Sequence, residues 1–153
     1  MKFIALEAGQ YIFQTGKSEK QWLCQVLHLY PLVGVAPQRI SKTATSAEIE
    51  ESQRMLNEAL AEQRAENRRL LETMLNEPDR FRENQDGYRL ALEPPQVEWL
   101  LQILNDIRLN CWQILGSPGA QDRRYVEVNE RTAPYYWAME MCAFFETALL
   151  EPL

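Results

Sequence analysis

The stretch Val97–Leu115, VEWLLQILNDIRLNCWQIL, decides the fold because its apolar residues recur at helical spacing. Apolar side chains three and four positions apart lie on one face of an α-helix. The series comprises Val97, Leu100, Leu101, Leu104, Ile107, Cys111, Ile114 and Leu115, and Trp99, Ile103 and Trp112 widen it. Pro94 and Pro95 suit the start of a helix, and Gly116 suits its end. The sequence therefore predicts a central helix that is buried on most sides.

Arg108 is the exception in this helix, because its position falls among the apolar residues. A guanidinium group buried without a partner costs several kcal/mol, so a carboxylate is expected beside it. The candidates are Glu140 and Glu146 on the last predicted helix. In a structural interpretation, Asn105 and Gln102 also form hydrogen bonds across the core and fix the register. In a functional interpretation, Arg108 binds a small anion or a partner's acidic side chain in a cleft.

Length and composition set the limits on the class of protein. The 153 residues include 16 Lys and Arg against 22 Asp and Glu, a formal net charge of −6, which argues against nucleic acid as a partner. We expect a single domain, 1–153. No apolar run approaches bilayer length and Met1–Gly16 lacks the features of a signal peptide, so a cytoplasmic protein without a membrane partner is expected. Cys24, Cys111 and Cys142 lie among apolar residues, which favours reduced, packed thiols.

The remaining patterns predict a mainly α fold with a small antiparallel sheet (α+β) and four main helices. The predicted strands are Phe3–Glu7, Tyr11–Thr15 and Gly87–Leu92, and the first two form a hairpin. The predicted helices are Ser18–Tyr30, Ser46–Asn76, Val97–Leu115 and Thr132–Leu150. Loops are expected at Leu32–Thr45, Glu77–Gly87 and Ser117–Arg131, the last with an extended stretch at Tyr125–Val128.

Two further predictions concern the first helix. Ser18 and Gln21 have the spacing of a capping box, so the helix is expected to begin there. Its inner face is expected to consist of Trp22, Leu23, Val26, Leu27 and Tyr30.

The predicted helix Ser46–Asn76 contains neither glycine nor proline and is rich in strong helix formers. Steps of four and three positions, the rhythm of a coiled coil, connect Ile49, Gln53, Leu56, Leu60, Gln63, Asn67, Leu70 and Met74. Because three of these positions are polar, two interpretations stay open. The helix packs at its C-terminal end and is solvated towards its start, or it forms a self-associating or partner-binding seam in which Gln53, Gln63 and Asn67 set the register.

The chain also resembles itself, which raises the hypothesis of an internal duplication of about 11–78 and 88–152. A gapless alignment pairs Tyr11 with Tyr88, Trp22 with Trp99, Leu23 with Leu100, Gln25 with Gln102, Val26 with Ile103, Leu27 with Leu104 and Leu32 with Leu109. A second alignment places residues 71–78 on residues 145–152. Two strand-helix-helix halves would then pack about a pseudo-twofold axis, with His28 opposite Asn105.

Few residues offer catalytic or metal-binding chemistry. His28 is the only histidine, which excludes a histidine-rich zinc site and a ferritin-like di-iron site. Cys24 shares a helix face with it, but no glycine-rich turn beside either residue could supply an oxyanion hole. Phosphate-binding loops, dinucleotide fingerprints and nucleophile elbows are also missing from the sequence. We therefore expect no catalytic residue, metal or cofactor.

Two groups of residues are candidates for binding. The candidate ligand-binding residues are Asn105, Arg108 and His28. The candidate interface residues are Tyr135, Trp137, Met141 and Phe144, because the last helix has more apolar surface than one buried face needs.

The run Trp99–Leu109, WLLQILNDIRL, is followed by a helix with Tyr136 and Trp137 near its start. In this it resembles a family of uncharacterised bacterial proteins, best known from actinobacteria, that carry a Leu-Asn-Asp-Leu-Arg-Leu segment. The resemblance covers about a dozen residues closely and the C-terminal half loosely. It implies a helical fold and no established activity. Some members are encoded beside an adaptor of the Clp protease system, which would imply protein handling or regulation.

The hypothesis from sequence is a cytoplasmic, non-enzymatic protein-interaction or regulatory module. Its partner is a second copy, as a homodimer, or another protein, and the contact uses the last helix or the helix Ser46–Asn76. The alternative is a small-anion or small-molecule binding protein or enzyme with a pocket around Arg108. A transcriptional regulator is less well supported, because the chain lacks a basic recognition helix.

Overall fold

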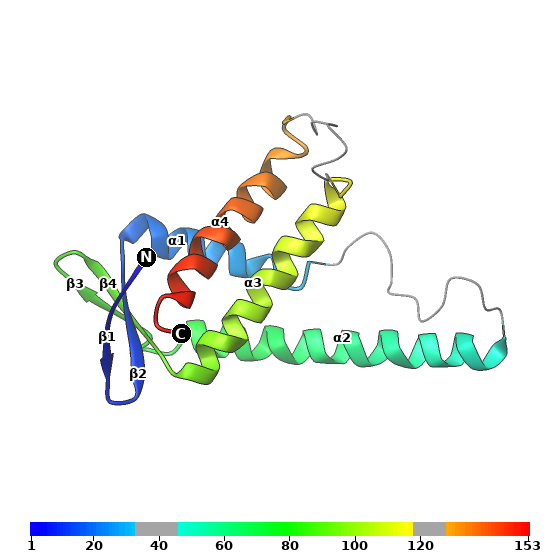
Figure 1. Ribbon diagram of the computed structural model, residues 1–153, viewed down its shortest axis with the longest axis horizontal. Helices are drawn as coiled ribbons and strands as arrows, with labels where there is room; N and C mark the ends of the chain where they lie inside the picture. The colour runs from blue at the N-terminus through cyan, green and yellow to red at the C-terminus, as the bar shows by residue number, and fades with distance from the viewer. Residues whose placement is uncertain (33–45, 118–127) are drawn as a thin grey trace.

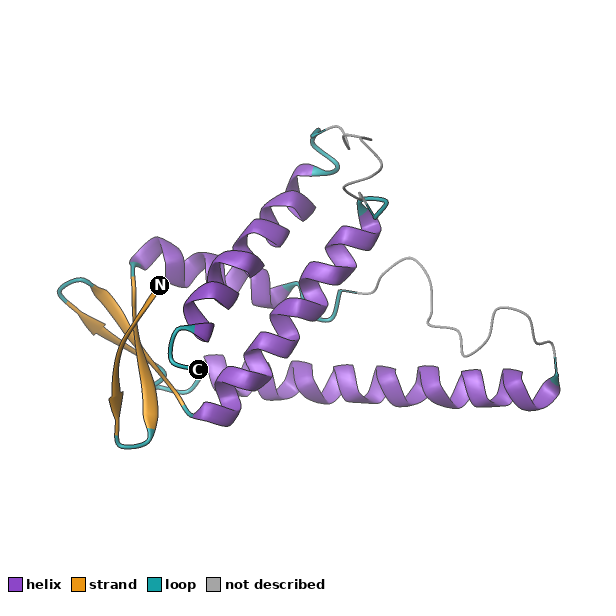
Figure 2. Cartoon of the chain, viewed as in Figure 1, coloured by secondary structure: helices purple, strands orange, loops and turns teal. Residues whose placement is uncertain are grey.

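The computed structural model describes residues 1–32, 46–117 and 128–153, which form four helices and one four-stranded antiparallel sheet (Figure 2). In chain order the elements are β1 (Lys2–Glu7), β2 (Gln10–Thr15), α1 (Lys17–His28), α2 (Ala47–Leu75), β3 (Phe81–Asn84), β4 (Gly87–Leu92), α3 (Pro94–Ile114) and α4 (Ala133–Leu150). The predicted α+β class is confirmed. Most of the predicted loops at Leu32–Thr45 and Ser117–Arg131, with nearly all of Tyr125–Val128, lie outside the described residues.

The sheet lies at one end of the fold, opposite the projecting end of α2 (Figure 1). It joins two hairpins in the order β1-β2-β4-β3. Its two central strands, β2 and β4, run antiparallel, and Phe13 pairs with Leu90 in their middle. Both side chains are buried in the hydrophobic core. The centre of the sheet therefore forms one wall of the core, as alternation along an antiparallel strand requires.

β3 is a strand that sequence analysis missed, since a turn was predicted for Glu77–Gly87. The sequence of this strand is Phe-Arg-Glu-Asn, which lacks the alternation of apolar and polar residues that predicts a strand. β3 lies at the edge of the sheet, where polar side chains can stay in solvent, so it needs no such alternation. Gly87 then opens β4 with a φ of 128°, and a Cβ at this position would lie 2.4 Å from the carbonyl oxygen of Thr15. The second hairpin therefore requires glycine at this residue.

α1 differs from its prediction in its cap and in its inner face. The backbone N–H of Gly16 donates to Glu19 Oε2 at 2.7 Å, so the predicted capping pair of Ser18 and Gln21 is wrong. The buried residues of the helix are Leu23, Val26 and Leu27. Successive side chains of an α-helix are rotated by about 100° about its axis, so Trp22 lies beside the buried face rather than on it. Its side chain is 40% exposed.

α3 and α4 pack side by side and antiparallel and supply most of the helical core (Figure 1). Their bounds confirm the predictions to within a few residues. The core side chains from these helices are Val97, Leu100, Ile103, Leu104, Ile107, Cys111, Ala138, Cys142, Phe145 and Leu149. The predicted buried series is therefore confirmed for Val97, Leu100, Leu104, Ile107 and Cys111, whereas burial on most sides is wrong, because Glu98, Gln102, Asn105, Leu109 and Gln113 form an exposed face.

α2 is a 29-residue helix that begins after the N-cap Ser46, as predicted. Only Leu71 and Met74, in its last two turns, are buried. Its N-terminal part extends away from the other helices (Figure 1). Within the described chain the buried residues of α2 thus lie near its C-terminal end, as the first interpretation predicts, and the partner-binding interpretation stays a prediction.

Arg80 fixes the end of α2 to the sheet and to α3. Its side chain is 7% exposed, and Nη1 donates to the carbonyl oxygen of Ala91 at 2.6 Å and to Gln96 Oε1 at 3.0 Å. Nη2 pairs with Glu77. The pairing of β4 with β3 ends at Leu90, one residue before Ala91. The guanidinium therefore provides the carbonyl of Ala91 with the hydrogen bond that a longer β3 would have supplied.

Candidate functional site

The structure places Arg108 at the edge of the contact between α3 and α4. Its Nε lies 3.3 Å from Glu146 Oε2, and its Nη2 donates to Asn105 Oδ1 at 2.8 Å. The predicted carboxylate partner is confirmed as Glu146, whereas Glu140 is exposed. The predicted full burial is wrong: the side chain of Arg108 is 40% exposed, although its Nε is buried beside Glu146.

The other two candidate ligand residues do not complete a pocket with Arg108. His28 is exposed, and its Nδ1 contacts the backbone oxygen of Cys24 at 2.6 Å. No contact described for the chain joins His28 to Arg108 or Asn105. Asn105 and Gln102 are both exposed, so the predicted hydrogen bonds across the core are wrong for these two residues.

Burial governs the electrostatics of the groups around this ion pair. Desolvation raises the pKa of Glu146, although the charge of Arg108 lowers it, and Oε1 of Glu146 is buried without a hydrogen-bond partner among the described residues. Burial raises the pKa of Cys111 to about 11 and that of Cys142 to about 12. Both thiols are fully buried and free, so they pack as apolar groups rather than as nucleophiles.

The four candidate interface residues of α4 are mostly used inside the chain. Tyr135, Trp137 and Met141 are half-buried and pack against the core. Phe144 is 40% exposed and meets the ring of Phe145 edge to face, with centroids 5.1 Å apart. The wide apolar face predicted for the last helix is therefore reduced to Phe144 and its surroundings.

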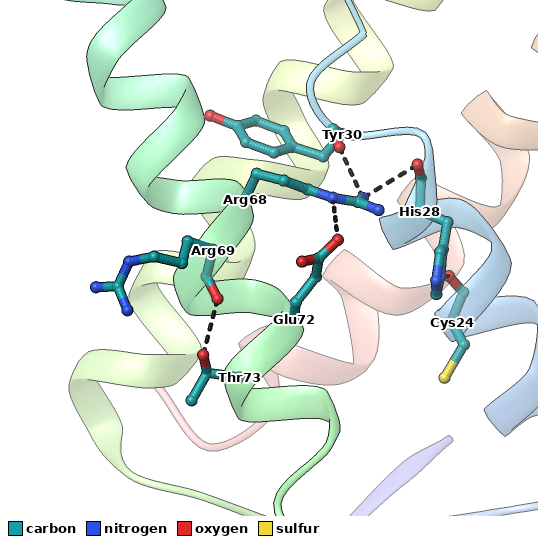
Figure 3. Close-up of polar contacts among 7 residues, drawn as sticks. All are labelled: Cys24, His28, Tyr30, Arg68, Arg69, Glu72 and Thr73. Carbon is teal, nitrogen blue, oxygen red and sulfur yellow. Dashed lines mark hydrogen bonds and ion pairs between the residues drawn. The ribbon is translucent and has the colours of Figure 1, made fainter.

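A polar junction holds the C-terminal part of α2 against the C-terminal end of α1 (Figure 3). Nη1 of Arg68 donates to the backbone oxygens of His28 at 3.2 Å and Tyr30 at 2.9 Å. Its Nε pairs with Glu72 at 2.8 Å. A cation at the C-terminal end of a helix meets unpaired carbonyls and the negative end of the helix dipole, so Arg68 fixes the direction in which α2 leaves the core.

Asn67 extends this junction to α3. Its Nδ2 donates to Tyr30 Oη at 3.2 Å, and its Oδ1 accepts from Trp99 Nε1 at 3.2 Å. One amide thus satisfies an aromatic group on each neighbouring segment. The predicted role of Asn67 in setting the register of a seam is replaced, at this end of α2, by a contact within the chain.

A cavity of about 190 Å³ lies next to this junction, between α2 and α3. It is lined by Tyr30, Leu60, Gln63, Arg64, Asn67, Trp99, Gln102, Ile103 and Asp106. Of the described arginines of α2, Arg54, Arg68 and Arg69 each pair with a glutamate of the same helix, whereas Arg64 has no described partner. The sequence contains a signal for this difference that was missed, since the positions three and four away from Arg64 hold no acidic residue.

Beyond the cavity a stripe continues along the projecting part of α2. We define the α2 stripe as Ile49, Leu56 and Leu60, all half-buried. Leu60 faces α3 across the cavity, and none of the three belongs to the described hydrophobic core. Glu50, beside the stripe, is exposed and also has no described partner. Two charged groups, Glu50 and Arg64, therefore lie beside the apolar stripe and have no partner among the described residues.

Neither the described residues nor the comparisons identify a chemical activity. Among residues 1–32, 46–117 and 128–153, no group of three His, Cys, Asp or Glu could hold a metal, and no helix has the length and apolarity to cross a bilayer. A scan against protein-family models, a search of curated proteins and a search of solved structures each found no match. The resemblance to the bacterial family with the Leu-Asn-Asp-Leu-Arg-Leu segment stays a prediction.

Proposed function

We propose that this chain is a non-enzymatic, cytoplasmic protein-interaction module that self-associates through α2. The observation that carries the proposal is the α2 stripe, which lies on a projecting helix and is not part of the described hydrophobic core. Isolated helices are only marginally stable in water, and helices in proteins gain most of their stability by packing an amphipathic face, so a long solvated helix favours a partner. Three free cysteines suit a reducing compartment.

The proposal includes the internal duplication, which several pairs of contacts support. Both halves have the order hairpin, helix, helix, and the two hairpins close on equivalent pairs, Glu7 with Gln10 and Asn84 with Gly87. Aligning Tyr11 with Tyr88 also aligns Phe13 with Leu90, which is the pair at the middle of β2 and β4. A twofold axis through that pair would exchange the two halves.

The helix starts of the two halves agree as well. The same alignment places Gly16 on Glu93 and Glu19 on Gln96. The backbone N–H of Gly16 donates to Glu19 at 2.7 Å, and the backbone N–H of Glu93 donates to Gln96 at 2.9 Å. These contacts are local and were not part of the sequence alignment, so they support the duplication independently.

The duplication explains why α2 would need a partner. In the second half, α3 extends to Ile114 and packs antiparallel along α4, whereas its counterpart α1 ends at His28. The alignment at the ends of the halves places Arg64 on Ala138, which is fully buried. Arg64 thus occupies a position that an antiparallel helix covers in the other half. We propose that a second copy covers this position of α2.

Sedimentation velocity over a range that includes tens of micromolar tests the proposal. We expect a reversible dimer, because polar residues interrupt the seam and weaken it. Leu56→Glu should shift the protein to monomer, while Met55→Glu, at a neighbouring side chain that is 60% exposed, should leave the dimer intact. Circular dichroism should show equal helix content for both variants. A monomer at every concentration would overturn the proposal.

Small-anion binding at Arg108 is the second candidate. It is favoured only by the 40% exposure of the guanidinium, and Glu146 already neutralises that group. Titration of the intact protein with inorganic phosphate, followed by NMR, tests it: saturable shifts around Arg108 that vanish in Arg108→Met would support a site.

A further inference from the structure

We propose that the cavity between α2 and α3 binds a small zwitterion of the α-amino-acid class, with its carboxylate on Arg64 and its ammonium group on Asp106. All the residues that line this cavity belong to one chain, so the site goes beyond the proposed self-association and does not depend on it.

The cavity has one unpaired charge of each sign, Arg64 on α2 and Asp106 on α3. Both residues are half-buried, and within the described chain they form no ion pair with each other or with any other residue. The buried Asn110 donates through Nδ2 to Asp106 Oδ1 at 3.3 Å, which orients the carboxylate and leaves Oδ2 without a described partner. A partly buried charge loses hydration that nothing else in the chain replaces, so a ligand that carries both charges can satisfy both groups.

The rest of the cavity offers a fixed apolar surface. The amide of Asn67 bonds to Tyr30 Oη and to Trp99 Nε1, so both aromatic side chains are held in place without a ligand. Leu60 and Ile103 add aliphatic groups to the lining. A cavity of about 150 Å³ is large enough to enclose benzene. The volume of about 190 Å³ therefore suits an amino acid with an apolar side chain such as that of leucine.

The other half of the chain has apolar residues at the equivalent place. Under the duplication proposed above, the alignments place Arg64 on Ala138, which is fully buried. They place Asp106 on Leu29. α1 and α4, the counterparts of α3 and α2, pack against each other. The fold therefore does not require a cation and a carboxylate at this position, which favours a role in binding for the two charges.

Isothermal titration calorimetry of the full chain with L-leucine tests the ligand class. We expect saturable binding. L-leucinamide lacks the carboxylate and N-acetyl-L-leucine lacks the ammonium group, so each should bind about tenfold or more weakly. Equal binding of N-acetyl-L-leucine would indicate a site for anions only and overturn the inference. No saturable binding of L-leucine or L-phenylalanine up to about 10 mM would overturn it as well.

Neutral variants test which residue meets which charge. Arg64→Gln should remove the preference for L-leucine over L-leucinamide, and Asp106→Asn should remove the preference over N-acetyl-L-leucine. Arg69→Gln and Glu98→Gln are the matched controls, because both residues are exposed on the same two helices and do not line the cavity. They should leave the affinity within about twofold. Preferences that persist in Arg64→Gln and Asp106→Asn would overturn the assignment, and circular dichroism should show equal helix content throughout.

The Leu56→Glu variant separates this site from the proposed self-association. Binding of L-leucine to this variant as a monomer would support a site made by one chain, and loss of binding would overturn it. A natural chain that binds L-leucine but is monomeric at every concentration would overturn the self-association alone.

Discussion

Arg108 on α3 and Glu146 on α4 form an ion pair at 3.3 Å in which the two groups differ in exposure, 40% for the arginine and 17% for the glutamate. Removing the arginine leaves a largely buried carboxylate without its counter-charge. We expect Arg108→Met to destabilise the fold by about 1 kcal/mol, less than a fully buried pair would lose, because solvent screens the interaction. Urea denaturation of the variant measures this change, and an unchanged midpoint would contradict it.

Glu146→Gln and Glu19→Gln should change the pH dependence of the free energy of unfolding in opposite directions. Burial raises the pKa of Glu146, so its contribution to stability is present at low pH and is lost as the pH rises through the raised pKa. Burial also acts to raise the pKa of Glu19, but the Gly16 N–H and the N-terminal ammonium outweigh it and lower the pKa. The contribution of Glu19 is therefore present at neutral pH and is lost as the pH falls through the lowered pKa.

Free energies of unfolding from neutral pH down to about pH 3 separate these two effects. Relative to the natural chain, Glu19→Gln should be destabilised at neutral pH and converge with it in acid. Glu146→Gln should be equal or more stable at neutral pH and lose that advantage in acid. Parallel curves for both variants would contradict the assigned shifts.

Arg80→Met should destabilise the chain by about 2–3 kcal/mol, because it leaves the carbonyl of Ala91 and the side chain of Glu77 without their partner. Arg82→Met is the matched control. The side chain of Arg82 is 71% exposed and lies 3.6 Å from Asp79, so its loss should change stability by less than about 0.5 kcal/mol. Thermal unfolding of both variants measures the difference.

Gly87→Ala should destabilise the second hairpin by about 2 kcal/mol or more, since a Cβ would meet the backbone oxygen of Thr15 and the φ is positive. Gly9→Ala is the control, because no atom lies within 4 Å of a Cβ there. Its φ of 78° should make it mildly destabilising only. Equal losses would show that backbone conformation, not the close approach, sets the requirement.

The helices and the first hairpin could be predicted from the sequence because the spacing of apolar residues and the turn residues are local signals, whereas the predicted capping pair of α1 was wrong. The partner of Arg108 could also be predicted, because an arginine on an apolar helix needs a carboxylate on a neighbour. Its exposure could not, because it depends on how close to the edge of α4 the side chain lies. The junction of Arg68 and Asn67 with α1 and α3 joins distant segments, and no local pattern encodes it.

The sheet is completed only when β2 of the first hairpin pairs with β4 of the second, so each hairpin covers an open strand edge of the other. A fragment that ends near Pro78 would keep its hairpin and two helices but present the bare edge of β2, and its complement would present β4. Mixed together, the two pieces should dock through these strands and recover one continuous sheet, with β2 of one piece paired to β4 of the other.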